Sequence, residues 1–249
     1  FIYQKFAAFS YLILFVICYL LFVVCYSFAF LSMMLDYNPV PFDHTYILYD
    51  PNDIIAKICV QFSLLPIYLM VFYTSWFLIT REIEPVIIVG GHLINELINK
   101  IIKVSIKSPR PDFHKNFGRD GGSYGMTYGF PSAHSQFMGF FAGYYICVIL
   151  LKVPMPKSSK KPICLFAAIS MMGVAFSRVY LLYHSNVQVI AGLITGVTLG
   201  IIYFIITSVA RDVGLVEWIL NWPIIKYFYV KDTYYHIYQT FAEEYEVYL

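Results

Sequence analysis

The chain has 249 residues, of which 59% are hydrophobic and 13% are charged, and its formal net charge is +2. Soluble domains carry about 25% charged residues, so this composition excludes a soluble enzyme and indicates an integral membrane protein. No basic stretch is interleaved with aromatic residues, and nucleic acid is therefore not expected as a partner. The 23 tyrosines and 22 phenylalanines are typical of membrane interfaces and of packed transmembrane helices.

Six segments are long and apolar enough to cross a bilayer, which needs about 20 mostly apolar residues. In chain order they are residues 6–35, 54–80, 86–106, 132–151, 163–182 and 187–210. We therefore expect an all-α protein, a polytopic membrane helix bundle of about six transmembrane helices. The first segment has no charged residue and is too long for the apolar part of a signal peptide, so we interpret it as a tilted anchor helix.

These spans divide the chain into three parts: an N-terminal anchor at 1–35, a membrane-embedded core at 36–210 and a C-terminal tail at 211–249. The tail holds Trp218, Trp222 and Lys226, which favours a position at the interface or in the cytosol. Because the chain begins at Phe1 rather than at a methionine, we expect further residues before it. The cysteines lie in apolar runs without metal-ligand spacing, which predicts buried thiols and no metal site.

The charges of the loops predict how the bundle is oriented. Segment 152–162 carries four lysines and no acid, whereas 36–53 carries four aspartates and neither Lys nor Arg. Cytosolic loops are enriched in Lys and Arg, so we expect 152–162 in the cytosol. Segment 108–131 and the turn at 183–186 then face the opposite side. The basic residues of 108–131 weaken this asymmetry, which is consistent with an anion site there.

Three clusters of polar residues occur at the ends of the predicted spans, and the six-span topology places all three at one membrane face. They are Lys103 with Arg110-Pro111, then Pro131-Ser132-Ala133-His134, then Ser177-Arg178 with His184. Ionisable side chains within apolar segments are costly and indicate a functional site.

The cations Lys103, Arg110 and Arg178 predict a phosphate-binding group. Fixed cations stabilise the negative charge that spreads over a phosphoryl group as it is transferred. Alternatively, each cation extends its charged end to the lipid headgroups. That alternative suits Lys103 better than Arg178, because the chain must enter the membrane again almost at once after Arg178.

Ser132 is a favoured N-cap residue and follows a glycine-rich loop, so we expect a helix to begin there. The free N–H groups of a helix start are a ready anion site. An ordinary helix cap beside a chance histidine is the alternative interpretation.

His184 is the candidate nucleophile, because an imidazole can attack phosphorus and form a covalent intermediate. Gln188, one helical turn further on, can accept the N–H of the other ring nitrogen. His134 is then the candidate general acid, which protonates the leaving oxygen and later activates water. The alternative for either histidine is a hydrogen-bonded residue at the membrane interface without a catalytic role.

The third span carries a polar stripe, which we interpret as structural support turned mostly towards the bundle interior. Its members are His92, Asn95, Glu96, Asn99, Lys100 and Lys103.

Taken together, the three clusters resemble the signature of the type-2 phosphatidic acid phosphatase superfamily, K-x6-RP, PSGH and SR-x5-H-x3-D, in the same order and spacing. Two positions differ, since Ala133 stands for Gly and Gln188 for Asp. The resemblance covers about residues 39–235 and implies that Lys103, Arg110, Arg178, Ser132 and the backbone of Ala133 hold phosphate. It further implies His184 as nucleophile, Gln188 as its orienting partner and His134 as acid.

Within the superfamily, segments 40–50 and 125–140, together with Gln188, look like the fungal type of the dolichyl-diphosphatase subfamily. This resemblance implies a multi-pass enzyme of the endoplasmic reticulum membrane whose site faces the lumen. It also implies metal-independent hydrolysis of dolichyl diphosphate, without a cofactor, which recycles the lipid carrier for N-glycosylation. The implied partners are the polyprenyl diphosphate and membrane lipids.

Two other functions stay open at this stage. One is a phosphatase for another lipid phosphate, such as phosphatidate or a sphingoid-base phosphate. The other is a non-catalytic membrane protein that binds lipid phosphates, for which the Gln at position 188 is the only support.

Overall fold

The computed structural model describes Ile47, Tyr49, residues 53–110, 128–153 and 155–232, and four residues near the C-terminus (245, 246, 248 and 249). Among these described residues, the regular secondary structure is helical and no β-strand is present. The helices are α2 (Ile54–Thr80), α3 (Glu84–Ile106), α5 (Ala133–Cys147), the π-helical turn η3 (Val148–Lys152), α6 (Lys157–Tyr180), α7 (Asn186–Asp212), α8 (Leu215–Leu220) and α9 (Pro223–Tyr227).

Five of these helical segments are long and apolar enough to span a membrane: α2, α3, α5 with η3, α6 and α7. They coincide with five of the six predicted spans, and the fold class predicted from the sequence is confirmed. The remaining predicted span, 6–35, lies outside the described residues.

The start of α6 differs from the prediction. The helix begins at Lys157, so Lys157, Lys160 and Lys161 lie in its first turns rather than in a loop. The connection from η3 is correspondingly short, 153–156. Hydropathy marks where a helix enters the apolar core, whereas lysine is a good helix former and lets the helix extend beyond that point.

Helix α5 packs closely against α7 because glycines on both helices let the backbones approach. A Cβ added to Gly139 or Gly143 would lie 2.8 or 2.7 Å from a carbonyl oxygen of α7. Conversely, a Cβ added to Gly192 would overlap the carbonyl oxygen of Ser132, and one added to Gly200 would overlap that of Phe140. Small residues at such spacings are typical of membrane helices in close contact. This contact places the start of α5 beside the start of α7.

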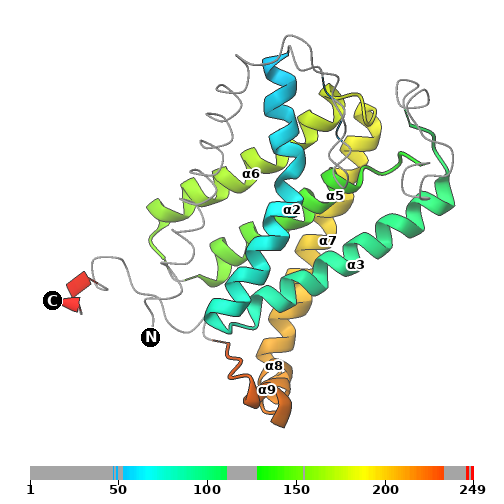
Figure 1. Ribbon diagram of the computed structural model, residues 1–249. Coiled ribbons are helices and arrows are strands. Elements are labelled where there is room, and N and C mark those ends of the chain that lie inside the picture. The colour runs from blue at the N-terminus through cyan, green and yellow to red at the C-terminus, as the bar shows by residue number, and fades with distance from the viewer. Residues whose placement is uncertain are drawn as a thin grey trace.

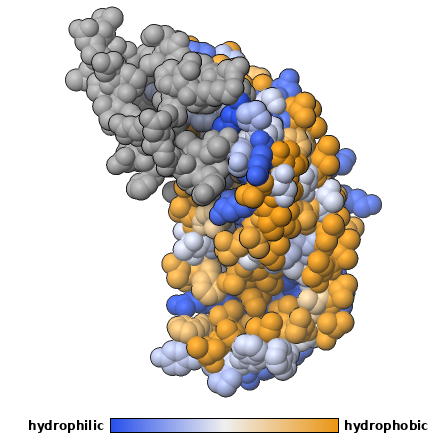
Figure 2. All heavy atoms as spheres, turned by 90° about the vertical axis from the view of Figure 1, so that its right-hand side faces the viewer, coloured by the Kyte–Doolittle hydropathy of each residue, from blue (hydrophilic) through white to orange (hydrophobic). Residues whose placement is uncertain are grey.

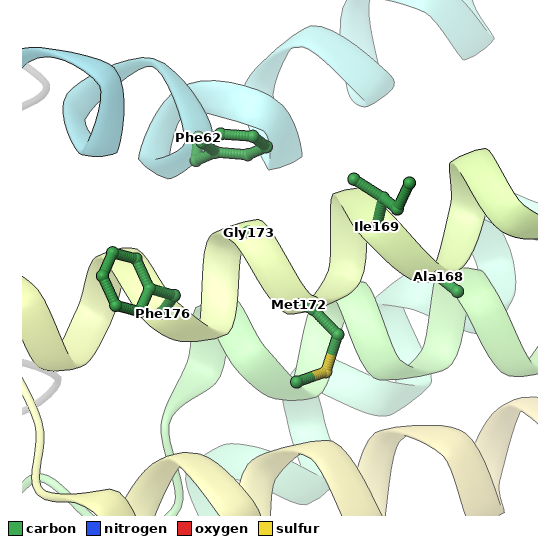
Figure 3. A pocket seen from close by; sticks show the side chains of 6 residues that line it. All are labelled: Phe62, Ala168, Ile169, Met172, Gly173 and Phe176. Carbon is green, nitrogen blue, oxygen red and sulfur yellow. The ribbon is translucent and has the colours of Figure 1, made fainter. Parts of the chain in front are cut away.

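The outer surface suits a lipid environment. Figure 2 shows hydrophobic residues over most of the middle of one side, with hydrophilic residues gathered towards its two ends. Apolar residues also line an open pocket of about 420 Å³ between α2 and α6, where the ring of Phe62 lies over Gly173, with Ile169 and Phe176 on either side (Figure 3).

The lower end of the bundle in Figure 1 carries α8 and α9 below α7. There the buried carboxylate of Glu84 accepts from the Tyr144 hydroxyl at 2.8 Å and pairs with Arg211. Arg211 also donates from Nε to Asp232 at 2.7 Å. These contacts tie the segment after α9 to the start of α3.

Candidate active site

The candidate site lies at the opposite end of the bundle from α8 and α9, where the end of α3, the start of α5 and the turn between α6 and α7 meet (Figure 1). The turn is tight, because the backbone N–H groups of Tyr183 and His184 both donate to the carbonyl oxygen of Arg178, at 3.0 and 3.1 Å. Arg178, in the last turn of α6, is therefore held close to His184 although five residues separate them.

The imidazole of His184 is buried and has two oxygen partners at one nitrogen. Its Nδ1 lies 3.0 Å from the carbonyl oxygen of Gly129 and 3.2 Å from Oε1 of Gln188. A carbonyl oxygen only accepts hydrogen bonds, so Nδ1 carries the proton. The lone pair of the neutral ring is therefore on Nε2.

Gln188 connects all three sequence clusters. Its Nε2 donates to the carbonyl oxygen of Pro109 at 2.8 Å, which directs its Oε1 to His184. Its backbone carbonyl accepts from the N–H of Ser132 at 3.0 Å. The same side chain forms a capping box with Ser185 at the start of α7. The predicted contact between His184 and Gln188 is thus present, and Gln188 also has a structural role that spacing alone did not indicate.

Burial and positive charge keep His184 neutral. Burial is the largest effect and, together with the charges of Arg110, Arg178 and Lys103, lowers the pKa of His184 to about 3, although the hydrogen bond that Gln188 accepts raises it. Burial also lowers the pKa of the Arg110 guanidinium. All three predicted cations therefore act on the predicted nucleophile, as the convergence of the clusters requires.

Arg178 is 3% exposed and is held on two sides. Its Nη2 donates to the hydroxyl of Ser63 on α2 at 2.6 Å, and its guanidinium carbon lies 4.5 Å from the ring centroid of Tyr183. Its Nε is buried and has no hydrogen-bond partner among the described residues. This arrangement does not support the alternative that Arg178 extends to the headgroups.

Ser132 is the N-cap of α5, as predicted, and its hydroxyl accepts from the N–H of Ser135 at 3.4 Å. Ala133 and His134 form the first turn, where backbone N–H groups have no partner within the helix. His134 lies within the electrostatic reach of Arg178, His184 and the other two cations. The second cluster therefore joins the other two.

The polar stripe of α3 supports the site, as predicted, with two exceptions. His92, Asn95, Asn99 and Lys103 are buried, whereas Glu96 and Lys100 are exposed and form an ion pair at 3.8 Å.

Gln136 on α5, which is not among the predicted site residues, links the stripe to the second cluster. It donates to Oδ1 of Asn95 at 2.9 Å and accepts from Asn99 at 2.7 Å. Asn99 lies 3.4 Å from the carbonyl oxygen of Pro131. The cap of α5 is thereby fastened to α3.

Two more residues of the site were not predicted. Ser63 carries no motif, and Gly129 contributes only a backbone oxygen, so neither gives a sequence signal. No three His, Cys, Asp or Glu side chains within the described part of the chain are close enough to hold a metal ion.

The fold and the site define a multi-pass membrane helix bundle in which three cations and two histidines lie together at one end. The model of the PAP2 superfamily matches residues 84–212, and the chain belongs to this superfamily. A dolichyldiphosphatase of Saccharomyces cerevisiae is 44% identical over 214 residues, which cover 85% of this chain and 88% of that protein. The protein is therefore a hydrolase of the membrane, and the family predicted from the sequence is confirmed.

Other relatives are more distant. Dolichyldiphosphatase 1 of Homo sapiens is 31% identical over 209 residues, which cover 81% of this chain and 84% of the relative. A crystal structure of a PAP2-type phosphatidylglycerolphosphate phosphatase from Bacillus subtilis aligns with a TM-score of 0.47 at 20% identity, over 81% of this chain and 94% of the other.

Proposed function

We propose that this protein hydrolyses dolichyl diphosphate to dolichyl phosphate and inorganic phosphate. The observation that carries the proposal is the neutral His184, whose Nδ1–H is held by Gly129 and Gln188 among three cations. The substrate is inferred from the similarity to the dolichyldiphosphatase of Saccharomyces cerevisiae, which extends over most of both chains.

The reaction proceeds in two displacements on the terminal phosphorus. Nε2 of His184 attacks this phosphorus, and the bond to the bridging oxygen breaks. His134 gives a proton to the departing dolichyl phosphate. A water molecule then attacks the phosphohistidine while His134 takes its proton, which releases inorganic phosphate and restores the neutral His184.

The cations stabilise the charge that develops in both displacements. Arg178 and Arg110 are suited to bidentate contact with phosphate oxygens, and Lys103 acts as a point charge. Ser132 and the first backbone N–H groups of α5, at Ala133, complete the phosphate site. Arg178 and Ser132 are fixed by the contacts described above, so they need little reorganisation during the reaction.

The first test is phosphate release from dolichyl diphosphate by the purified chain in excess chelator, alongside a His184→Ala variant. We expect release by the parent, loss of at least about a thousandfold in the variant, and an acid-labile phosphoprotein in the parent alone. Release of phosphate from phosphatidate but not from dolichyl diphosphate would mean that phosphatidate, rather than dolichyl diphosphate, is the substrate. Lipid binding without any release would contradict hydrolysis at this site.

We further propose that the site faces the lumen of the endoplasmic reticulum, where its product is recycled for protein N-glycosylation. The lysines at the start of α6 lie at the other end of the bundle, which supports this orientation. Labelling with an impermeant maleimide distinguishes the two sides. In sealed vesicles with the cytosolic face outward, the introduced thiol of Lys161→Cys should be labelled and that of Lys107→Cys protected. The reverse pattern would contradict the proposal.

A further inference from the structure

Arg178 is held by a helix that lies outside the region matched by the family model. Ser63 belongs to α2, whereas the match covers 84–212. The two residues are 115 positions apart, yet Nη2 of Arg178 lies 2.6 Å from the Ser63 hydroxyl oxygen. Ser63 is 1% exposed, so water does not compete for this contact.

The hydroxyl of Ser63 is prepared to accept a hydrogen bond. It lies 2.9 Å from the carbonyl oxygen of Cys59, one turn earlier in α2, and this carbonyl can only accept the hydroxyl proton. The neighbouring hydroxyl of Ser177 is 3.0 Å away and has its own acceptor in the carbonyl oxygen of Val174, at 2.7 Å. With both protons directed to backbone carbonyls, the lone pairs of Ser63 are available to Arg178.

The contacts of Arg178 leave one edge of the guanidinium for a ligand. Ser63 holds Nη2, and the ring of Tyr183 lies against the planar face. Nε, which is buried, finds no acceptor among the described residues. An unpaired buried donor is costly unless a ligand oxygen satisfies it, and a phosphate oxygen is an acceptor of the required kind.

We propose that Ser63 is a positioning residue for the reaction, which fixes the guanidinium of Arg178 so that its free edge faces a phosphate oxygen. The inference rests on the phosphate-binding role proposed above for Arg178. Ser63 does not touch the substrate, and its effect on phosphate is transmitted through Arg178.

The test compares Ser63→Ala with Ser75→Ala. Ser75 is a matched control, since it lies on the same helix and its hydroxyl bonds to the carbonyl oxygen four residues earlier at 3.0 Å, but it is exposed. In each purified variant, binding of inorganic phosphate is measured by calorimetry, and kinetics are measured with dolichyl diphosphate. We expect Ser63→Ala to weaken phosphate binding by about tenfold or more and to lower kcat, and Ser75→Ala to leave both unchanged.

A double-mutant cycle separates positioning from a general effect on folding. In an Arg178→Ala background, Ser63→Ala should weaken phosphate binding no further, because the guanidinium that Ser63 holds is gone. An equal loss in both backgrounds, or unchanged phosphate binding in the single variant, would overturn the inference. So would a parent chain that binds no phosphate. Phosphate binding that depends on Ser63 without hydrolysis of dolichyl diphosphate would uphold the positioning of Arg178 by Ser63 and contradict the proposed reaction.

Discussion

His184 donates from Nδ1 to the carbonyl oxygen of Gly129, which lies 3.0 Å away and 55 positions earlier in the chain. In the superfamily signature an aspartate stands where this chain has Gln188, and the amide alone is a weaker acceptor than a carboxylate. The Gly129 carbonyl supplies a second acceptor for the same proton. The tautomer needed for attack through Nε2 is therefore fixed without a negative charge beside the imidazole.

Removing the amide of Gln188 should slow the reaction without abolishing it. In Gln188→Leu the Gly129 carbonyl still holds the Nδ1 proton, so we expect kcat to fall by about tenfold, the effect of one neutral hydrogen bond. Steady-state kinetics on dolichyl diphosphate measure the change, and the unfolding temperature shows whether the capping box at α7 has been lost as well. A kcat equal to that of the parent would contradict a role of Gln188 in orienting His184.

Gln188→Glu should move the acid limb of the pH profile upward. A carboxylate beside the imidazole favours its charged form and raises the pKa of His184 from about 3. The free enzyme then becomes protonated, and loses its nucleophile, at a higher pH than the parent does. The logarithm of kcat/KM against pH checks this, and coincident profiles would show that residue 188 does not control the protonation of His184.

The folded protein should lose stability on acidification. The pKa of His184 is about 3 in the folded chain and about 6.5 when unfolded. Between these values the unfolded state binds a proton that the folded state excludes, so stability falls as the pH decreases from 6.5 towards 3. The contribution of His184 approaches about 1.4 kcal/mol per pH unit. Unfolding in detergent at several pH values measures the slope, and His184→Asn, which keeps a donor for Gly129, should have a smaller one.

The glycine contact between α5 and α7 should not tolerate a methyl group. A Cβ at Gly196 would overlap the carbonyl oxygen of Gln136, so Gly196→Ala should destabilise the protein by about 1–3 kcal/mol. Gly90→Ala on α3 is the matched control, since the nearest atom to its added Cβ is the Tyr203 hydroxyl at 3.5 Å. That change should be neutral or stabilise by up to about 1 kcal/mol, through helix propensity. Equal unfolding temperatures for the two variants would disprove the close approach.

Arg211 should be important for stability although it is remote from the candidate site. Its removal leaves the buried Glu84 without its cationic partner, which costs about 3–5 kcal/mol. Lys152, which pairs with the exposed Asp212 at 4.0 Å, provides the comparison, and Lys152→Ala should cost about 0–1 kcal/mol. Thermal unfolding of Arg211→Ala and Lys152→Ala measures both, and a small loss in Arg211→Ala would mean that Glu84 is neutral in the folded protein.

The local features that a single helix decides can be predicted from the sequence. Ser132 was expected as an N-cap, and Gln188 was expected to reach His184 because four residues are about one helical turn. The sequence is a poorer guide to side-chain exposure where neighbouring positions on a helix point in different directions. Glu96 follows the buried Asn95 by one residue, about 100° around the helix, and is exposed.

The linear sequence was enough to specify a multi-pass helical protein and the residues of its three clusters, because hydrophobic length and motif spacing are properties of the chain itself. It did not contain the contacts that orient those residues. The Gly129 carbonyl carries no side-chain signal, and Ser63 reaches Arg178 only because α2 packs beside α6. Such contacts join positions far apart in the chain, and therefore only the packing of the helices decides them.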